Sequence, residues 1–302
     1  MELGMIGLGR MGGNMARRLM RAGHRIVAYD LSNDAVRALE KEGAARTESL
    51  EELVASLSRP CAIWVMVPPG EATENAILTL AGLLSRGDIL IDGGNNYYKE
   101  SIRRAAELRE KGIRFMDVGT SGGIWGLERG YSLMIGGDRE SFQHMKPVFQ
   151  SLAPGPERGY GHVGPAGAGH FVKMVHNGLE YGLMQAYAEG FELLAAKKEF
   201  NLDLHQVSTI WQHGSVIGSF LLDMTEMALA KDPKLEGVRA FVQDTGEGRW
   251  TVQESVDLAV PTPVITAALQ VRFRSRQDEP FSARLLAMMR NLFGGHAIQK
   301  PK

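Results

Sequence analysis

The chain has 302 residues, which suits about two domains, since one hydrophobic core seldom serves more than about 250–300 residues. Its 34 Lys and Arg against 35 Asp and Glu give a formal net charge of -1. This balance gives no sign of a nucleic-acid-binding surface or an acidic disordered tail. Hydrophobic residues at 44% and charged residues at 23% are ordinary for a soluble globular protein.

The single cysteine, Cys61, excludes a disulfide within the chain and fits a reducing, cytoplasmic compartment. It lies in an apolar run, residues 61–67, and we interpret it as a core residue. The chain begins with a strand-like segment, so we expect no signal peptide. No run of 18 apolar residues predicts a membrane span, and no motif indicates a metal site.

Short β-like runs alternate with helical patterns through the first half. The predicted strands cover residues 3–8, 25–29, 62–67, 89–92, 114–118 and 132–135. A helical pattern over residues 11–22 ends at Gly23, and Ser32 or Asn33 is suited to cap a second helix. This alternation predicts a parallel sheet wound with right-handed crossovers, a Rossmann-type doubly wound α/β domain over residues 1–162.

The pattern changes around Gly159. After a glycine-rich segment at 164–169, a long helical stretch runs from about residue 171 to residue 198. Further helical patterns cover residues 204–213, 219–230, 251–258, 263–276 and 280–293. These predict an all-helical domain over residues 163–302, which would serve substrate binding and oligomerisation.

A G-x-G-x-x-G motif stands where the first predicted strand gives way to the first predicted helix. Its residues are Gly7, Leu8, Gly9, Arg10, Met11 and Gly12. The motif is weak alone, but in this context its glycines permit a tight turn and close approach of a pyrophosphate to the helix N-terminus. The alternative is a glycine-rich turn without a ligand.

Asp30 ends the second predicted strand, where an acidic residue hydrogen-bonds the adenine ribose of NAD. A carboxylate there would repel the 2′-phosphate of NADP, and no arginine follows immediately to bind one. We therefore expect NAD, with NADP less favoured. The alternative is that Asp30 only caps the following helix.

Two further loops follow predicted strands. Val67 and Pro68 come after one strand, and Asn95 comes after the next. Ligands of a doubly wound sheet lie beyond the carboxyl ends of its strands, so we predict that these residues contact the cofactor. Plain turns are an equal alternative on this pattern alone.

A stripe of polar residues occupies one face of the long predicted helix, at i, i+3, i+4, i+7 and i+8. Its members are Lys173, His176, Asn177, Glu180 and Tyr181. A solvated surface is one interpretation. We favour a cleft, because these groups exchange protons or orient substrates and because the stripe follows the glycine-rich segment directly.

At these residues the chain resembles the β-hydroxyacid dehydrogenase superfamily, and within it the short, NAD-type branch of the 6-phosphogluconate dehydrogenase family. The motif at 7–12, the loop at 119–123 and the pair Lys173 and Asn177 are superfamily features, which would equally suit a 3-hydroxyisobutyrate dehydrogenase. The segments 91–95, 173–181 and 290–296 are more specific to the phosphogluconate branch.

The resemblance implies a reaction, the decarboxylating oxidation of 6-phosphogluconate to ribulose 5-phosphate and CO₂ with reduction of NAD, a step of the pentose phosphate pathway. It implies that Lys173 takes the proton of the C3 hydroxyl while hydride leaves C3, and that Glu180 then protonates C1 of the enediol. His176 and Asn177 would orient the substrate, and Tyr181 would contact its phosphate.

The remaining contacts also follow from the resemblance. Asn95 and the loop of Ser121, Gly122 and Gly123 would bind the hydroxyls and carboxylate of the substrate. Arg290 and His296, in the C-terminal tail, would reach the site of a neighbouring subunit. The chain would then form a homo-oligomer, a dimer or a tetramer.

The chain departs from the long form of the family, which has a duplicated helical region and a Lys-Gly-Thr-Gly-Lys-Trp-Thr run that helps bind phosphate. Thr245 and Glu247 replace the first lysine and the first threonine of that run. A carboxylate beside a phosphate is unfavourable unless it points away or pairs with a cation. Arg272, Arg274 and Arg276 are candidates to compensate, and the sequence does not choose among them or exclude plain surface roles.

Two other functions compete. Glu247 favours another β-hydroxyacid dehydrogenase with an unphosphorylated substrate, whereas His176, Glu180, Tyr181 and His296 oppose it. A non-catalytic nicotinamide-binding sensor is opposed by Lys173, since a sensor has no need of a base.

Overall fold

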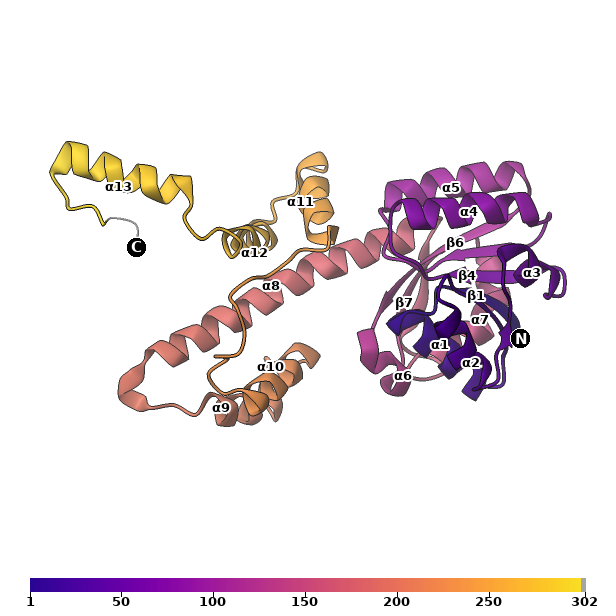
Figure 1. The fold of residues 1–302 in the computed structure, drawn as a ribbon, viewed down its shortest axis with the longest axis horizontal. Coiled ribbons are helices and arrows are strands. Elements are labelled where there is room, and N and C mark those ends of the chain that lie inside the picture. The colour runs from indigo at the N-terminus through magenta and orange to yellow at the C-terminus, as the bar shows by residue number, and fades with distance from the viewer. Residues whose placement is uncertain (300–302) are drawn as a thin grey trace. The chain divides into compact units, whose positions relative to one another are not determined.

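The structure, a computed structural model, describes residues 1–299 (Figure 1). The chain forms two compact units, which divide between Asn177 and Gly178. Unit 1 covers residues 1–177 and contains the sheet, and unit 2 covers the residues from 178 onward.

Unit 1 is built on an eight-stranded sheet with the order β3-β2-β1-β4-β5-β6-β7-β8. The strands are β1 (Glu2–Ile6), β2 (Arg25–Tyr29), β3 (Ala45–Arg46), β4 (Ala62–Val65), β5 (Ile89–Asp92), β6 (Arg114–Ser121), β7 (Ser132–Gly137) and β8 (Tyr160–Gly164). From β3 to β6 every neighbouring pair is parallel. The predicted Rossmann-type, doubly wound sheet is therefore confirmed, and its strand order reverses between β1 and β4.

Three features of the sheet differ from the parallel arrangement of six strands that the sequence predicts. β7 is antiparallel to β6, β8 adds a strand beside β7, and the two-residue β3 adds one beside β2. Only residues 122–131 join β6 to β7, which is short for the crossover that parallel neighbours require. β8 has four half-buried residues out of five and includes two glycines and a histidine, so it lacks the apolar run of a central strand.

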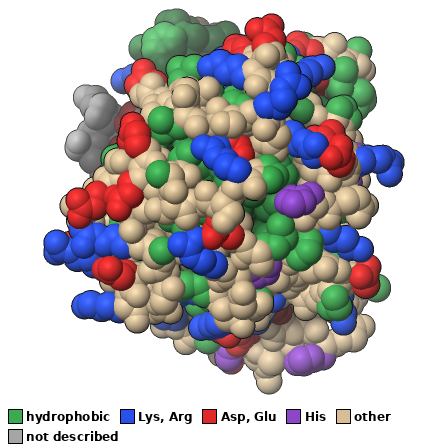
Figure 2. All heavy atoms as spheres, turned by 90° about the vertical axis from the view of Figure 1, so that its right-hand side faces the viewer, with side chains coloured by type: hydrophobic (Ala, Val, Ile, Leu, Met, Phe, Trp, Pro, Cys, Tyr) green, Lys and Arg blue, Asp and Glu red, His purple; other side chains and the backbone are tan. Residues whose placement is uncertain are grey.

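Helices cover both faces of the sheet. They are α1 (Arg10–Arg21), α2 (Asn33–Glu40), α3 (Leu50–Ala55), α4 (Glu71–Leu83), α5 (Tyr98–Glu110), η1 (Gly123–Trp125), α6 (Gly126–Arg129) and α7 (Arg139–Leu152). α1, α2 and α7 bury their apolar residues in one core cluster, and α3, α4 and α5 in the other. Viewed from one side, the surface intersperses basic and acidic side chains, in keeping with the near-zero net charge (Figure 2).

Unit 2 is helical, as the sequence predicts. α8 (Ala168–Ala196) crosses the division between the units, and η2 (Lys198–Phe200), α9 (Leu204–Gln212), α10 (Phe220–Lys231), α11 (Glu247–Asp257), α12 (Pro263–Arg274) and α13 (Phe281–Gly294) follow. Two small clusters form its interior, one around Tyr181 and one around Phe191. α13 buries no residue, and Phe281, Leu292 and Phe293 are 72%, 78% and 75% exposed.

Candidate active site

The carboxyl ends of five parallel strands place most predicted site residues along one edge of the sheet. β2, β1, β4, β5 and β6 are consecutive neighbours. The residues that follow or end them are Asp30, Gly7, Val67, Asn95 and Ser121. The sheet therefore brings the predicted cofactor loops and the substrate loop to the same edge within unit 1.

Close packing requires glycine at two positions of the first loop, whereas the space around the third glycine is open. Gly7 has a φ of +89°, and a Cβ there would stand 2.3 Å from the Met66 carbonyl oxygen. A Cβ at Gly12 would stand 1.9 Å from the Gly7 carbonyl oxygen. Gly9 has no atom within 4 Å of its Cβ position, although it precedes the first turn of α1. The loop thus leaves room for a ligand at the N-terminus of α1.

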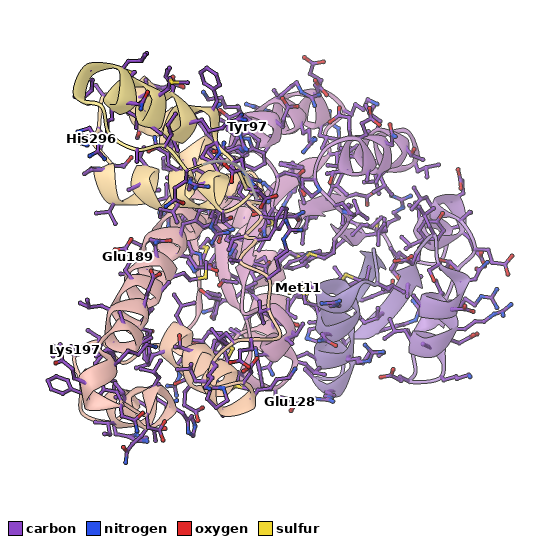
Figure 3. The ribbon with its side chains drawn as sticks, turned by 60° about the vertical axis from the view of Figure 1, so that its left-hand side comes forward. Met11, Tyr97, Glu128, Glu189, Lys197 and His296 are labelled. Atoms are coloured by element: carbon purple, nitrogen blue, oxygen red, sulfur yellow. The ribbon has the colours of Figure 1, made fainter. Side chains whose placement is uncertain are left out.

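This N-terminus suits an anion. Leu8 lies just before it, and Arg10 and Met11 are the first residues of α1, with Met11 labelled in Figure 3. Within residues 1–299 no side chain caps the helix, and its first turn carries no acidic residue. Its backbone N–H groups and positive dipole end are then available to a pyrophosphate.

Asp30 is held by two backbone amides. The Leu8 N–H donates to Oδ2 at 2.6 Å, and the Ser32 N–H donates to Oδ1 at 2.7 Å. The N-cap of α2 is Ser32, whose hydroxyl accepts from the Ala35 N–H at 3.4 Å. Asp30 therefore does not cap α2 itself. It links the two strand-end loops, and each carboxylate oxygen keeps a lone pair for a ribose hydroxyl.

The loops after β4 and β5 pack directly on each other. A Cβ at Gly94 would stand 3.0 Å from the Val67 carbonyl oxygen, so glycine permits this approach. Pro68 lies in the first loop, and Asn95, half-buried, lies in the second. Packed loops of this kind favour the cofactor-contact interpretation over two independent turns.

The N-terminal part of α8 is seated on the sheet by glycine and a buried carboxylate. Asp117, on β6, accepts from the Gly167 N–H at 2.7 Å and the His170 N–H at 2.8 Å. A Cβ at Gly119 would stand only 2.3 Å from the Lys173 Cβ. The carboxylate satisfies N–H groups at the helix start, and the missing side chain lets α8 touch β6.

Lys173, the first residue of the polar stripe, is buried and hydrogen-bonded. It is 5% exposed, and its Nζ donates to the Asn177 Oδ1 at 2.8 Å. The His176 Nδ1 lies 3.0 Å from the same oxygen, and its Nε2 lies 3.3 Å from the Ser121 hydroxyl. Because an amide oxygen only accepts, Nδ1 carries a proton, and a neutral imidazole then accepts from Ser121 at Nε2.

This cluster joins helix to loop at the sheet edge. Ser121 ends β6, and Gly122 and Gly123 follow it with φ values of +126° and +53°, which favour glycine. Lys173, His176 and Asn177 come from α8. An amine, an imidazole, an amide and a hydroxyl in one hydrogen-bonded group are suited to orienting a substrate and moving a proton.

Glu180 and Tyr181 continue along α8 in unit 2. Tyr181 is 5% exposed, its hydroxyl accepts from the Thr245 N–H at 3.1 Å, and the Arg272 guanidinium lies 3.5 Å from its ring centroid. A Cβ at Gly248 would stand 2.4 Å from the Tyr181 ring, so glycine lets α11 pack here.

Glu247 is buried at the first position of α11, and its carboxylate accepts from the Thr245 hydroxyl. An acidic residue is stabilised at a helix N-terminus. Of the three candidate arginines, Arg272 alone among the described contacts lies on Tyr181. Arg276 pairs with Asp244 at 2.8 Å, and Arg274 bonds the Gln277 carbonyl.

The predicted tail residues lie on exposed structure. Arg290 is in α13, and His296 follows its end (Figure 3). The Asn291 side chain donates to the His296 carbonyl at 2.9 Å. The predicted role of Arg290 and His296 at the site of a neighbouring subunit stays a prediction.

Several buried polar residues behind the loops escape the motif search. Asp92 is fully buried and accepts from Asn96 at 2.8 Å and from Arg104 at 3.2 Å. Burial raises the pKa of Asp92, while neighbouring His170 and Arg104 lower it. The available signal is a carboxylate that ends a run of buried apolar residues, because such a group requires partners.

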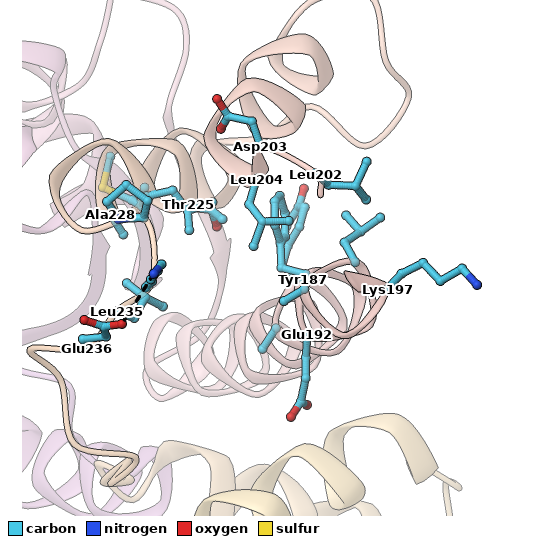
Figure 4. A pocket seen from close by; sticks show the side chains of 18 of the residues that line it. Tyr187, Glu192, Lys197, Leu202, Asp203, Leu204, Thr225, Ala228, Leu235 and Glu236 are labelled. Atoms are coloured by element: carbon cyan, nitrogen blue, oxygen red, sulfur yellow. Dashed lines mark ion pairs between the residues drawn. The ribbon is translucent and has the colours of Figure 1, made fainter. Parts of the chain in front are cut away.

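A groove in unit 2 lies away from these residues. It has a volume of about 1480 Å³ and is formed by the later turns of α8 with α9, α10 and the segment after them (Figure 4). Tyr187, Phe191, Leu204 and Leu235 are among its lining residues, and none of the predicted site residues is. The groove is therefore not the predicted active site.

The described residues meet neither the requirements of a metal site nor those of a membrane-spanning helix. Across residues 1–299 no group of three or more His, Cys, Asp or Glu side chains is arranged to hold a metal ion. In the same residues every helix is too short or too polar to traverse a lipid bilayer.

Two known families match nearly the whole chain. Residues 2–164 match the NAD binding domain of 6-phosphogluconate dehydrogenase, and residues 169–280 match the 6-phosphogluconate dehydrogenase C-terminal domain. The NAD(+)-dependent, decarboxylating 6-phosphogluconate dehydrogenase of Haloferax volcanii is 45% identical over 301 residues, which cover 99% of each chain.

Solved structures agree with this match. The 6-phosphogluconate dehydrogenase of Plasmodium falciparum, determined in apo form and in complex with NADP+ and with 6-phosphogluconate, superposes with a TM-score of 0.85 at 27% identity. All of the present chain is covered, but only 66% of that longer chain. The 3-hydroxyisobutyrate dehydrogenase of Mycobacterium tuberculosis gives a TM-score of 0.74 at 20% identity, with 92% and 94% covered, which is a likeness of fold.

Proposed function

Because this chain belongs to the 6-phosphogluconate dehydrogenase family, we propose that it oxidises and decarboxylates 6-phosphogluconate to ribulose 5-phosphate and CO₂, with NAD as hydride acceptor. Full-length similarity to an NAD(+)-dependent, decarboxylating relative supports the reaction. The observation that carries the proposal is the buried Lys173 amine, bonded to Asn177 in one cluster with His176 and Ser121.

Lys173 acts as the base in this proposal. Bound NAD supplies the hydride acceptor, and the neutral amine takes the proton of the C3 hydroxyl as C3 is oxidised. The Asn177 oxygen accepts a hydrogen bond from either the amine or the ammonium, so Lys173 keeps its orientation before and after proton transfer. His176, which is held by a hydrogen bond to the same Asn177 oxygen, orients the substrate.

Decarboxylation follows from the product of that step. The 3-keto acid loses CO₂ because its carbonyl accepts the electrons of the breaking bond, and the Lys173 ammonium stabilises the enolate oxygen. Glu180 then donates a proton to C1 of the enediol and yields ribulose 5-phosphate. Asn95 and the loop of Ser121 to Gly123 bind hydroxyls and carboxylate.

The phosphate is bound in unit 2. Tyr181 and Arg272 offer a hydroxyl and a guanidinium at one place, and guanidinium groups bind phosphate well. Glu247 does not oppose this, since its carboxylate bonds Thr245 and its charge is offset at the start of α11. Arg272 thus compensates for the altered residues at 245 and 247.

NAD is favoured over NADP by Asp30. Its carboxylate is fixed by the Leu8 and Ser32 amides at the position expected for the adenine ribose. The following residue, Leu31, is 91% exposed and provides no cation for a 2′-phosphate.

The chain assembles as a homo-oligomer in which α13 packs on a second copy. The exposed Phe281, Leu292 and Phe293 of α13 favour burial in a partner, as large apolar patches mark interaction sites. Arg290 and His296 then contribute to a neighbouring site. Light scattering of the full chain and of a chain ending at residue 280 tests this, and a full chain that stays monomeric contradicts it.

The reaction is tested by following NADH formation from 6-phosphogluconate, with NADP in a parallel assay and with CO₂ measured. The proposal expects turnover with NAD and one CO₂ for each NADH. A second candidate is oxidation of an unphosphorylated β-hydroxyacid, because Thr245 stands where the long form of the family has a lysine that helps bind phosphate. Activity on gluconate or 3-hydroxyisobutyrate without activity on 6-phosphogluconate supports that second candidate and overturns the first.

A further inference from the structure

A continuous series of hydrogen bonds connects the loop after β4 to the loop after β5. The Thr73 hydroxyl, on α4, donates to the Pro68 carbonyl at 2.9 Å. The Asn96 amide donates to the Thr73 hydroxyl at 3.3 Å and to the Asp92 Oδ1 at 2.8 Å. The Thr73 hydroxyl therefore acts both as a donor, to Pro68, and as an acceptor, from Asn96.

The series is buried and anchored at its far end. Thr73 and Asp92 are fully buried, and Asn96 is 4% exposed. The other Asp92 oxygen accepts from Arg104 at 3.2 Å, and Arg104 in turn bonds Glu74, on α4, at 2.8 Å. Two helices and a strand end therefore fix the position of the Asn96 side chain.

The two loops joined in this way are those that carry Pro68 and Asn95. A buried polar group that loses its hydrogen-bond partner cannot bond water instead, which costs free energy. The series therefore sets the distance between the loops. Gly94 packs between the Asn96 amide and the Val67 carbonyl, since a Cβ there would stand 2.8 Å from the amide nitrogen and 3.0 Å from the carbonyl oxygen. A shift of either loop would break a bond that water cannot replace.

We infer that Thr73 and Asn96 are positioning residues, which align Asn95 with the loop after β4 so that both contact the nicotinamide cofactor and substrate together. Neither residue touches the reacting atoms in this inference. They act through the backbone of Pro68 and through the peptide that joins Asn96 to Asn95. The inference rests on the proposed function for its cofactor and substrate.

Thr73→Val tests the inference, because valine keeps the shape of threonine and lacks the hydroxyl. We expect Kd for NADH and KM for both substrates to rise about threefold to tenfold, because both hydrogen bonds of the buried hydroxyl, to the Pro68 carbonyl and from the Asn96 amide, are lost. Thr73→Ser, which keeps the hydroxyl, should stay within about twofold of the unchanged chain. Asn96→Ala should act in the same direction and serves if the valine variant does not fold.

Thr79→Val is the matched control on the same helix. Thr79 is exposed, and its hydroxyl bonds only the Asn75 carbonyl one turn earlier, at 2.9 Å, among the described contacts. Unchanged Kd and KM in Thr73→Val or Asn96→Ala, with or without a lower melting temperature, would overturn the inference. NADH binding, measured by fluorescence, needs no turnover, so absent 6-phosphogluconate activity in the unchanged chain contradicts the proposed function alone.

Discussion

The two units of the chain are stabilised in different ways. In unit 1, helices cover both faces of the sheet, and the polar groups at its carboxyl edge bond one another. In unit 2, the interior consists of two small clusters, and α13 exposes its apolar residues. Lys173 is therefore positioned by contacts of α8 with the sheet of the same chain. We expect α13, in contrast, to bury its apolar residues only against a second copy of the chain.

The largest expected effect tests the fixed lysine of unit 1. Lys173→Met should lower kcat by about 10²–10⁴-fold, the usual contribution of a general base. NADH binding and the melting temperature should change little, because methionine fills a similar volume. Lys41→Met, at the exposed end of α2, is the control. Substantial residual turnover in Lys173→Met would remove it as the base.

Glu180→Gln tests the proposed proton donor, which lies on α8 at the start of unit 2. Steady-state turnover should fall by about 100-fold, since the enediol loses its proton donor. NADH formation in a single turnover should stay near the unchanged rate, because the hydride step precedes that protonation. Glu189→Gln, on an exposed later turn, is the control. An unaltered steady-state rate would rule out Glu180 as the donor.

A smaller effect is expected at the phosphate subsite. Arg272→Ala should raise KM for 6-phosphogluconate by about 10–100-fold, as a charge-assisted contact is lost, and leave KM for NAD unchanged. Arg274→Ala, two residues along α12, should have little effect, because among the described contacts only Arg272 lies on the Tyr181 ring. Equal changes in the two variants would show that Arg272 has no special place.

The smallest expected effect concerns the adenine end of the cofactor. Asp30→Ala should raise KM for NAD about fivefold to tenfold and narrow the preference over NADP, because the ribose loses an acceptor and a repelling charge. Asp34→Ala, exposed on α2, controls for a general loss of negative charge. A preference for NAD that persists in Asp30→Ala would place discrimination elsewhere.

The sequence predicts the parts of this molecule that depend on local patterns. Apolar runs and helical periodicity locate most strands and helices, and the i, i+4 spacing of Lys173 and Asn177 correctly anticipates that they lie side by side. β8 is missed because glycines and a histidine interrupt its apolar residues, and β3 because it has only two residues. The reversal of β7 is missed because strand direction depends on the connection rather than on the strand itself.

Contacts between distant segments are beyond such patterns. Thr73 and Arg104 are ordinary polar residues in the sequence, and folding brings them to Asn96 and to Asp92, respectively. Our proposal of Arg272 among three arginines rests likewise on a contact with Tyr181 within unit 2. Helical spacing predicts which side chains share a face of a helix, but it does not predict which residues of other elements they contact.

An amide, rather than a carboxylate, accepts from both Lys173 and His176. A neutral acceptor gives direction to the two donors without adding a charge that would favour their cationic forms. An aspartate at 177 would keep nearly the same shape but would place a negative charge beside both donors. The amide at residue 177 therefore orients the lysine and the histidine through hydrogen bonds alone, without an anionic partner in the cluster.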